Sequence, residues 1–269
     1  MNRIDTAFRK LRRDGRKAFM PFIAAGDPNL ETTAAVLKAL QERGVADLVE
    51  VGVPFSDPIA DGPTIQASYQ RALAAGVTPQ AILDMIAGLR ADGFTLPVCL
   101  MVSYSLVFCP GMEAFVERAA KAGVDGLIVP DLPVDESEGL GRALVERQMA
   151  HILLIAPTTP PERRRKIIAR ASGFIYCMSV TGITGERTAL PPTLAEYVRS
   201  VKKVAKVPVV VGFGVSRPEH VAAVAEVADG AIVGSAIVSR IAEHAGESPD
   251  AVAKVVADLC AELSAPLRG

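Results

Sequence analysis

The chain has 269 residues, of which 50% are hydrophobic and 22% are charged. Its 29 basic and 30 acidic residues nearly cancel, so the composition predicts neither a nucleic-acid-binding surface nor an anionic-membrane-binding one. The length fits one (β/α)8 barrel and allows a large apolar core without disulfides or structural metals.

The first 15 residues have the spacing of an amphipathic helix and lack the apolar stretch of a signal peptide. No apolar run reaches the length of a membrane span. The four cysteines show no paired or zinc-type spacing, and Cys99 and Cys177 lie in apolar runs where buried thiols are expected. We therefore expect a reduced, cytoplasmic protein.

Short apolar runs alternate along the chain with longer segments of helical spacing. The runs are rich in Val, Ile and Leu without polar alternation, which is typical of parallel strands buried on both faces. The predicted strands are Ala18–Ala24, Leu48–Val53, Pro97–Val102, Gly126–Val129, His151–Ile155, Gly173–Met178, Pro208–Gly212 and Gly230–Gly234.

The segments between the runs carry helix signals. Thr78 and Pro79 have the residue types of an N-cap and a first helical position, and Ser216–Glu219 has the form of a capping box. The predicted helices include Leu30–Arg43, Pro79–Arg90, Gly111–Ala122 and Val134–Arg147. The basic run Arg163–Lys166 is interpreted as a solvated helical face.

Eight strand–helix pairs with short links predict an α/β fold: a single (β/α)8 TIM barrel over residues 1–269, with an extra N-terminal helix. An open doubly wound sheet is the competing architecture. It would need a dinucleotide-type glycine fingerprint after the first strand, and residues 24–28, Ala-Ala-Gly-Asp-Pro, are not one.

Glu50 lies inside the second predicted strand, where a carboxylate is costly to bury. Burial should raise its pKa and make it able to give and to take a proton. A carboxylate satisfied by a neighbouring hydroxyl or amide is the alternative. Because catalytic groups of such barrels lie at the C-terminal ends of strands, a functional role is favoured.

The segment 54–66 is longer than a strand–helix link requires and contains three prolines and two aspartates, Asp57 and Asp61. Prolines stiffen a loop and present side chains at little entropic cost. Asp-Pro and Asp-Gly are also ordinary turn formers, and that interpretation would hold for an isolated pair.

Glycine-rich turns follow the seventh and eighth predicted strands, at 211–216 and 233–236. Glycine lets backbone N–H groups approach an anion, and barrels often hold phosphate in these two loops. The turns together predict a phosphate site at the amides of Gly214, Gly234 and Ser235, with the Ser235 hydroxyl available.

Residues 48–66, LVEVGVPFSDPIADGPTIQ, resemble the signature of the tryptophan synthase α family, and the resemblance extends in order over the whole chain. It implies a lyase that cleaves indole-3-glycerol phosphate by retro-aldol chemistry, with Glu50 and Asp61 as the catalytic pair. Glu50 would assist protonation of indole C3, and Asp61 would accept the indole N–H. The resemblance implies no metal and no organic cofactor.

The same resemblance extends to further positions of the site. It places Phe22, Leu100, Leu127 and Ile232 around the indole, and Tyr176 near the reacting glycerol. It gives Gly185 a phosphate contact and lets Thr184 steady Asp61 when the loop after the sixth strand closes. Asp131 has a structural role by this match, orienting that loop or the partner contact.

The resemblance also implies a β-subunit partner that carries pyridoxal phosphate, in an α2β2 heterotetramer. Segment 54–60 and the loop at 103–109 would face it. This loop departs from the family pattern, because Ser105 stands where Asn is usual and the following proline is missing. The departure concerns partner contact and coupling.

Two other functions fit a phosphate-binding barrel. A phosphosugar isomerase or an indole-glycerol-phosphate synthase usually has a catalytic lysine at a strand end, but the nearest lysine here, Lys17, precedes its strand. A non-catalytic subunit that only activates a partner would not need both Glu50 and Asp61.

Overall fold

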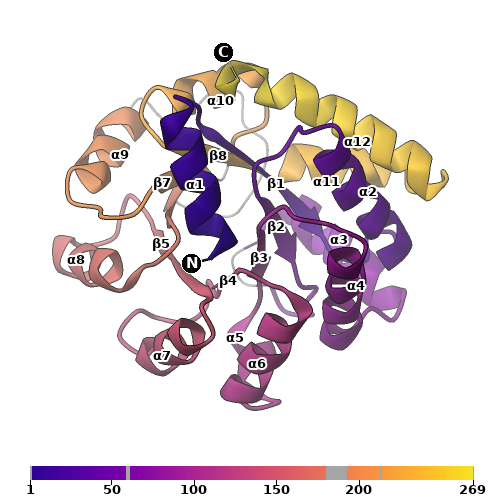
Figure 1. Ribbon diagram of the computed structural model, residues 1–269, viewed down its shortest axis with the longest axis horizontal. Helices are drawn as coiled ribbons and strands as arrows, with labels where there is room; N and C mark the ends of the chain where they lie inside the picture. Colours follow the sequence, from indigo (N-terminus) through magenta and orange to yellow (C-terminus); the bar gives the residue numbers. More distant parts are fainter. Residues whose placement is uncertain (1, 59–60, 180–192, 213, 269) are drawn as a thin grey trace.

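The computed structural model describes residues 2–58, 61–179, 193–212 and 214–268. In these residues eight parallel strands close into a barrel in chain order, with β1 paired to both β2 and β8 (Figure 1). The strands are β1 (Ala18–Ala24), β2 (Val49–Gly52), β3 (Val98–Met101), β4 (Gly126–Ile128), β5 (Ala150–Ile155), β6 (Ile175–Met178), β7 (Val209–Gly212) and β8 (Gly230–Val233). The predicted TIM barrel is confirmed, with strand ends within about two residues of those expected.

Helices surround the barrel (Figure 1). They are α1 (Arg3–Arg13), α2 (Leu30–Glu42), α3 (Pro63–Ala74), α4 (Pro79–Ala91), α5 (Tyr104–Phe108), α6 (Met112–Ala122), α7 (Glu138–Glu146), α8 (Pro161–Arg170), α9 (Leu194–Lys202), α10 (Pro218–Ala225), α11 (Ser235–Glu243) and α12 (Pro249–Ser264), followed by a 3-10 turn, Ala265–Leu267. The short α5 was not expected, because its residues follow the third strand as a loop would.

The buried side chains form two separate cores. One fills the inside of the barrel, and the other lies between the barrel wall and the helices. Strand alternation divides each strand between them: Cys99 and Met101 of β3 belong to the inner core, and Val98 and Leu100 to the outer one.

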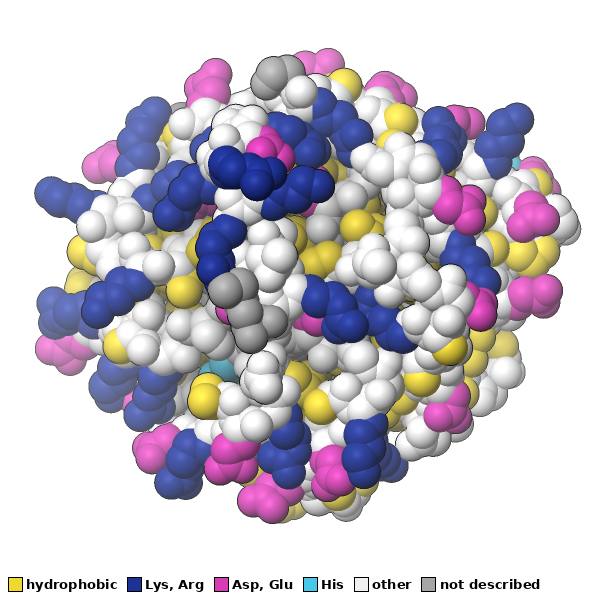
Figure 2. All heavy atoms as spheres, viewed as in Figure 1, with side chains coloured by type: hydrophobic (Ala, Val, Ile, Leu, Met, Phe, Trp, Pro, Cys, Tyr) yellow, Lys and Arg dark blue, Asp and Glu magenta, His cyan; other side chains and the backbone are white. Residues whose placement is uncertain are grey.

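Helix α1 closes the N-terminal end of the barrel. Its apolar side chains, Ile4, Phe8 and Leu11, are buried and belong to the inner core, and the Phe8 ring lies 5.9 Å from that of Phe174. Arg3 ties the helix to Asp125 in a 3.0 Å ion pair. Figure 2, in the same view as Figure 1, shows Lys and Arg side chains over the outer surface of this helix. Among the described residues, α1 therefore covers this end of the barrel interior.

Two predicted helix starts have different outcomes. Thr78 caps α4 as expected, since its side chain accepts a 3.2 Å hydrogen bond from the Ala81 amide. The prediction of a capping box at Ser216 is wrong, because the N-cap of α10 is Arg217. The Ser216 amide donates a 3.4 Å hydrogen bond to Nδ1 of His220. The Ser216 hydroxyl is thus left for another role.

The cysteine prediction holds: none of the four forms a disulfide, and Cys99, Cys177 and Cys260 are buried. Within the described ranges, no single helix is long and apolar enough to cross a membrane. Helices α3 and α4 meet the length and composition test only as a pair, and the pair is bent by 91°.

Candidate active site

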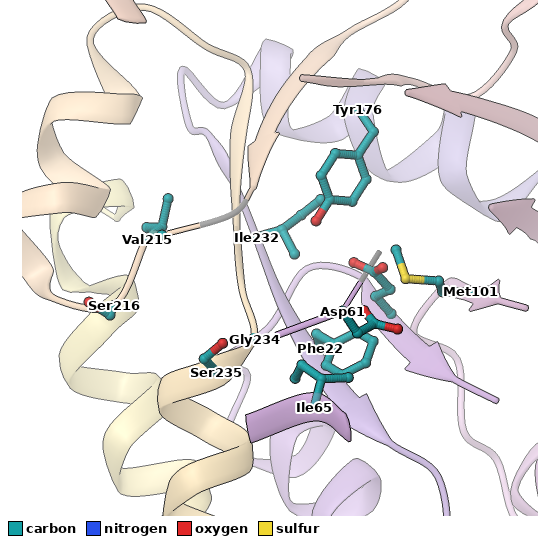
Figure 3. A pocket seen from close by; sticks show the side chains of 12 residues that line it. Phe22, Asp61, Ile65, Met101, Tyr176, Val215, Ser216, Ile232, Gly234 and Ser235 are labelled. Atoms are coloured by element: carbon teal, nitrogen blue, oxygen red, sulfur yellow. The ribbon is translucent and has the colours of Figure 1, made fainter. Parts of the chain in front are cut away.

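A pocket of about 480 Å³ opens at the C-terminal end of the barrel (Figure 3). The two predicted catalytic carboxyl groups and the predicted phosphate turns all meet there. Its lining residues are Phe22, Glu50, Asp61, Ile65, Met101, Tyr176, Gly214, Val215, Ser216, Ile232, Gly234 and Ser235.

Glu50 is the floor of this pocket. Glu50 is completely buried on β2, beside Phe22 of β1, and neither of its carboxyl oxygens has a hydrogen-bond partner among the described residues. Burial, followed by the negative charge of Asp61, raises the pKa of Glu50 to about 8. The carboxyl group is thus protonated at neutral pH. The alternative of a carboxylate satisfied by its neighbours does not fit.

Asp61 supplies the second carboxyl group, directly before the start of α3. Burial raises its pKa to about 6, which leaves it mostly ionised at neutral pH. One site therefore holds a protonated acid and an ionised base, and a separation of pKa values of this kind marks groups with different roles in proton transfer.

Apolar side chains form the walls around the two carboxyl groups. Figure 3 shows Tyr176 approaching from one side of the pocket, with Phe22 and Ile65 on the other and Ile232 between them. Tyr176 is buried, and its hydroxyl packs directly on Gly212, so this glycine leaves room for it. The slot is suited to a flat apolar ring.

Leu100 and Leu127 require a correction. They are paired neighbours on β3 and β4, and both belong to the outer core against the helices. Because side chains alternate along a strand, the inward positions are the next ones, Met101 and Ile128. Met101 lines the pocket in place of Leu100, and Ile128 lies in the inner core.

The predicted phosphate turns meet at the opposite end of the pocket from Asp61 (Figure 3). Helix α11 begins at Ser235 with Gly234 as its N-cap, so its first N–H groups lack partners within the helix. Gly214 has a φ of +75°, a conformation that favours glycine. The buried Ser216 hydroxyl, which also lines this pocket, has no hydrogen-bond partner in the part of the chain that the structure describes. This arrangement suits an anion.

Four residues that line the pocket were not predicted as site residues from the sequence: Ser216, Val215, Ile65 and Met101. Ser216 was assigned to a capping box, and Ile65 follows the loop as an ordinary helix residue. Met101 could not be distinguished from Leu100 by sequence, because only the register of β2 with β3, which pairs Gly52 with Met101, assigns it to the inner side. Thr184 and Gly185 lie outside the described residues.

Asp131 holds the start of α5. Its carboxylate accepts hydrogen bonds from the Ser103 hydroxyl at 2.7 Å and from the Tyr104 amide at 2.8 Å. This contact is structural, while the role of Asp131 in orienting the loop after β6 or the partner contact stays a prediction. Among the described residues, His, Cys, Asp and Glu form no group of three or more that could hold a metal ion.

A second cavity, of about 400 Å³, adjoins the first and shares Asp61 and Met101 with it. Its other lining residues are Val53, Phe55, Asp57, Pro58, Tyr69, Val102, Ser103, Pro130 and Asp131. Residues of two segments thus border the reaction pocket: 54–58, which resembles the family pattern, and Ser103, which begins the segment that departs from it.

Comparison with known proteins gives a consistent result. A family model described as tryptophan synthase alpha chain matches residues 8–266. The tryptophan synthase alpha chain of Prochlorococcus marinus (strain MIT 9313) is 47% identical over 261 residues, covering 97% of this chain and 93% of that one. That of Rhodopirellula baltica is 49% identical over 90% of this chain and 88% of its own length.

Solved structures agree in fold over nearly the whole chain. Tryptophan synthase subunit alpha from Legionella pneumophila superposes with a TM-score of 0.89 at 36% identity, covering 99% of this chain and 98% of that one. A structure of Mycobacterium tuberculosis tryptophan synthase gives 0.89 at 35% identity, covering 100% and 99%.

Proposed function

Because the chain belongs to the tryptophan synthase alpha chain family, which cleaves indole-3-glycerol phosphate to indole and glyceraldehyde 3-phosphate, we propose that the pocket at the barrel mouth is where this lyase reaction occurs. The observation that carries the proposal is the fully buried carboxyl group of Glu50, which has no hydrogen-bond partner within the described ranges and lies in a pocket that also holds Asp61.

The shape of the pocket orients the substrate. The phosphate would bind at the start of α11, through the amides of Gly234 and Ser235, with Gly214 and the Ser216 hydroxyl beside them. Thr184 and Gly185 remain predicted contacts from the loop after β6. With the phosphate held at this end, the indole extends toward Asp61 and lies between Phe22, Tyr176, Ile232 and Met101.

The two carboxyl groups then perform complementary proton transfers. Asp61 accepts a hydrogen bond from the indole N–H and stabilises the positive charge that develops on the ring. Glu50, protonated at neutral pH, gives its proton to indole C3. The resulting carboxylate takes the proton of the hydroxyl on the adjacent glycerol carbon. As that oxygen forms its aldehyde, the carbon–carbon bond breaks and its electron pair returns to the ring, which releases indole with Glu50 protonated again.

This chemistry needs no cofactor, because the protonated indole ring accepts the electron pair. Pyridoxal phosphate belongs, in our proposal, only to the partner β subunit. A rival isomerase or indole-glycerol-phosphate synthase mechanism calls for a lysine at the site, and the described lining of the pocket holds none. Release of free indole distinguishes the alternatives.

We further propose the β subunit as partner in an α2β2 assembly. A tryptophan synthase complex from Pyrococcus furiosus contains a chain that superposes on this one with a TM-score of 0.84 at 35% identity. Beside the second cavity, α5 presents Phe108 with 64% of its surface exposed, against the ring of Tyr104 at 5.7 Å. Phe108 belongs to the 103–109 segment that the family resemblance assigns to the β-subunit interface, so we propose it as a contact residue there.

The test is indole release from indole-3-glycerol phosphate by the purified chain, alone and with its β partner. Glu50→Gln should lower kcat by at least about a hundredfold, as loss of a general acid–base does, while glycerol phosphate binds as before. Glu117→Gln, an exposed glutamate on α6, serves as the matched control. Turnover by Glu50→Gln near that of the unchanged chain would refute the proposed role.

A further inference from the structure

Tyr69 occupies a position next to both carboxyl groups that the mechanism above does not use. It lies on α3, one turn after Ile65, and only 3% of its surface is exposed. It lines the second cavity together with Asp61, whose carboxyl group also faces the reaction pocket. Tyr69 is therefore part of the wall where the two cavities meet.

Gly52 allows the Tyr69 hydroxyl to reach this wall. A Cβ at Gly52 would lie 2.5 Å from the Tyr69 oxygen and 2.5 Å from Cζ of Phe22. Gly52 follows Glu50 by two residues on β2, so both project to the inside of the barrel. The phenol oxygen and the Phe22 ring thus meet over the inner side of Gly52, the next inward position after Glu50 toward the C-terminal end of β2.

The surroundings of the phenol are acidic. Burial, then the charges of Asp61 and Glu50, raise the pKa of Tyr69 well above its usual value, so the hydroxyl stays protonated and is available as a donor. In the described part of the chain, no side chain or amide donates a hydrogen bond to the Asp61 carboxylate. The other titratable groups around this wall are Glu50, Cys99, Tyr176, Asp57 and Asp131.

We propose that Tyr69 is a positioning residue for Asp61: with substrate bound, its hydroxyl donates a hydrogen bond to the Asp61 carboxylate and keeps that group ionised and aimed at the indole N–H. The inference rests on the proposed function, since it assumes that Asp61 acts in its ionised form. A donor to the charged form of an acid lowers its pKa, so removing the donor raises the pKa of Asp61.

Tyr69→Phe tests the proposal, because it removes only the hydroxyl. We expect the acid limb of the kcat profile for indole-3-glycerol phosphate cleavage to move up by about one pH unit, the effect of losing one hydrogen bond to a charged group. Since the pKa of Asp61 starts at about 6, kcat should fall about fivefold at pH 6 and about twofold at pH 7, while KM changes less than about twofold. Ser68→Ala is the matched control: it removes a buried hydroxyl from the same helix, one that donates to the Ile65 carbonyl at 2.7 Å, and should leave the profile in place.

A second measurement does not depend on turnover. Titration of Asp61 by carboxyl-carbon NMR in a Glu50→Gln background should show its pKa rise when Tyr69→Phe is added. Superimposable kcat profiles, or an unmoved Asp61 titration, would overturn the role of Tyr69. If the unchanged chain releases no indole at all, the proposed function fails instead, so the two failures are distinct.

Discussion

Glu50 and Asp61 are chemically similar side chains that the fold places in different conditions. Glu50 lies within a strand, where the barrel interior removes water on every side, and Asp61 lies at a helix start on the pocket edge. Their pKa values, about 8 and about 6, straddle neutral pH. A single buried site thereby holds a proton donor and a charge-stabilising base without any metal ligand set among the described residues.

The buried acid has a consequence for stability. The pKa of Glu50 is about 8 when folded and near 4.5 when unfolded, so the folded chain binds more protons between these values. The stability contributed by this group is complete below pH 4.5 and is lost as the pH rises through 8. Glu50→Gln, which cannot ionise, should therefore gain stability relative to the unchanged chain between about pH 5 and pH 8.

Urea unfolding of both chains at several pH values measures this gain. The difference in the free energy of unfolding should grow steadily in favour of Glu50→Gln as the pH rises. A difference that stays constant over this range would show that Glu50 keeps an ordinary pKa when folded.

Glu50 could be predicted from the sequence because a charged residue interrupts an otherwise apolar strand. Leu100 and Leu127 could not be excluded in the same way, because inward and outward positions of a fully buried strand have the same composition. Only the register of β2 with β3, which pairs Glu50 with Cys99, assigns the sides. Tyr69 carried no signal at all, since its role depends on Gly52 of a different element.

Among the elements, α3 connects the site to the rest of the barrel. It begins immediately after Asp61 and Gly62, carries Ile65 and Tyr69, and is fixed by Arg71. The Arg71 guanidinium donates two 2.7 Å hydrogen bonds to the carboxylate of Asp27, which follows β1 and is almost completely buried. This bidentate pair sets where the helix lies relative to the barrel mouth.

Breaking the pair should affect both stability and catalysis. Arg71→Met leaves the Asp27 carboxylate buried without its partner, and we expect a loss of about 1–3 kcal/mol in the free energy of unfolding together with a lower kcat. Lys38→Met is the control, because its pair with Asp92 is solvent-exposed and should contribute less than about 1 kcal/mol. Equal losses for the two variants, measured by urea unfolding, would contradict an anchoring role.

Two other elements show where a prediction from local sequence alone fails. Helix α5 is held by Asp131 from the next strand–helix loop, and the Ser216 amide bonds to His220 rather than leaving Ser216 to cap. Both outcomes depend on contacts outside the segment whose pattern was interpreted. Thr78, whose capping contact is to its own helix, was predictable for the opposite reason.

For the molecule as a whole, the alternation of strand and helix signals predicted the barrel. That helix α1 closes the N-terminal end of the barrel was known only from the structure. Helix α1 was expected as an amphipathic helix, with nothing to say where its apolar face would lie. The apolar side chains of α1 complete the inner core at the N-terminal end of the barrel. The described reaction pocket lies at the opposite end, which carries Glu50, Asp61 and the phosphate turns.

Phe8→Ala tests how much the packing of helix α1 against the inner core contributes to stability. Phe8 is 7% exposed and contacts the inner core, so its truncation should lower the free energy of unfolding by about 3–5 kcal/mol. Val145→Ala, at a side chain that is 67% exposed, should change it by no more than about 0.5 kcal/mol. Thermal or urea unfolding compares the two, and similar values would show that α1 is dispensable for the core.

Helices α2 and α12 pack against each other more extensively than any other pair of elements in the described chain. The first is made early during synthesis, and the second only after every strand of the barrel. Arg43, the C-cap of α2, pairs with Asp258 of α12 at 2.5 Å across this contact. The contact therefore joins the first strand–helix unit of the barrel to the helix that follows its eighth strand, and it fastens the closed ring of strands from the outside.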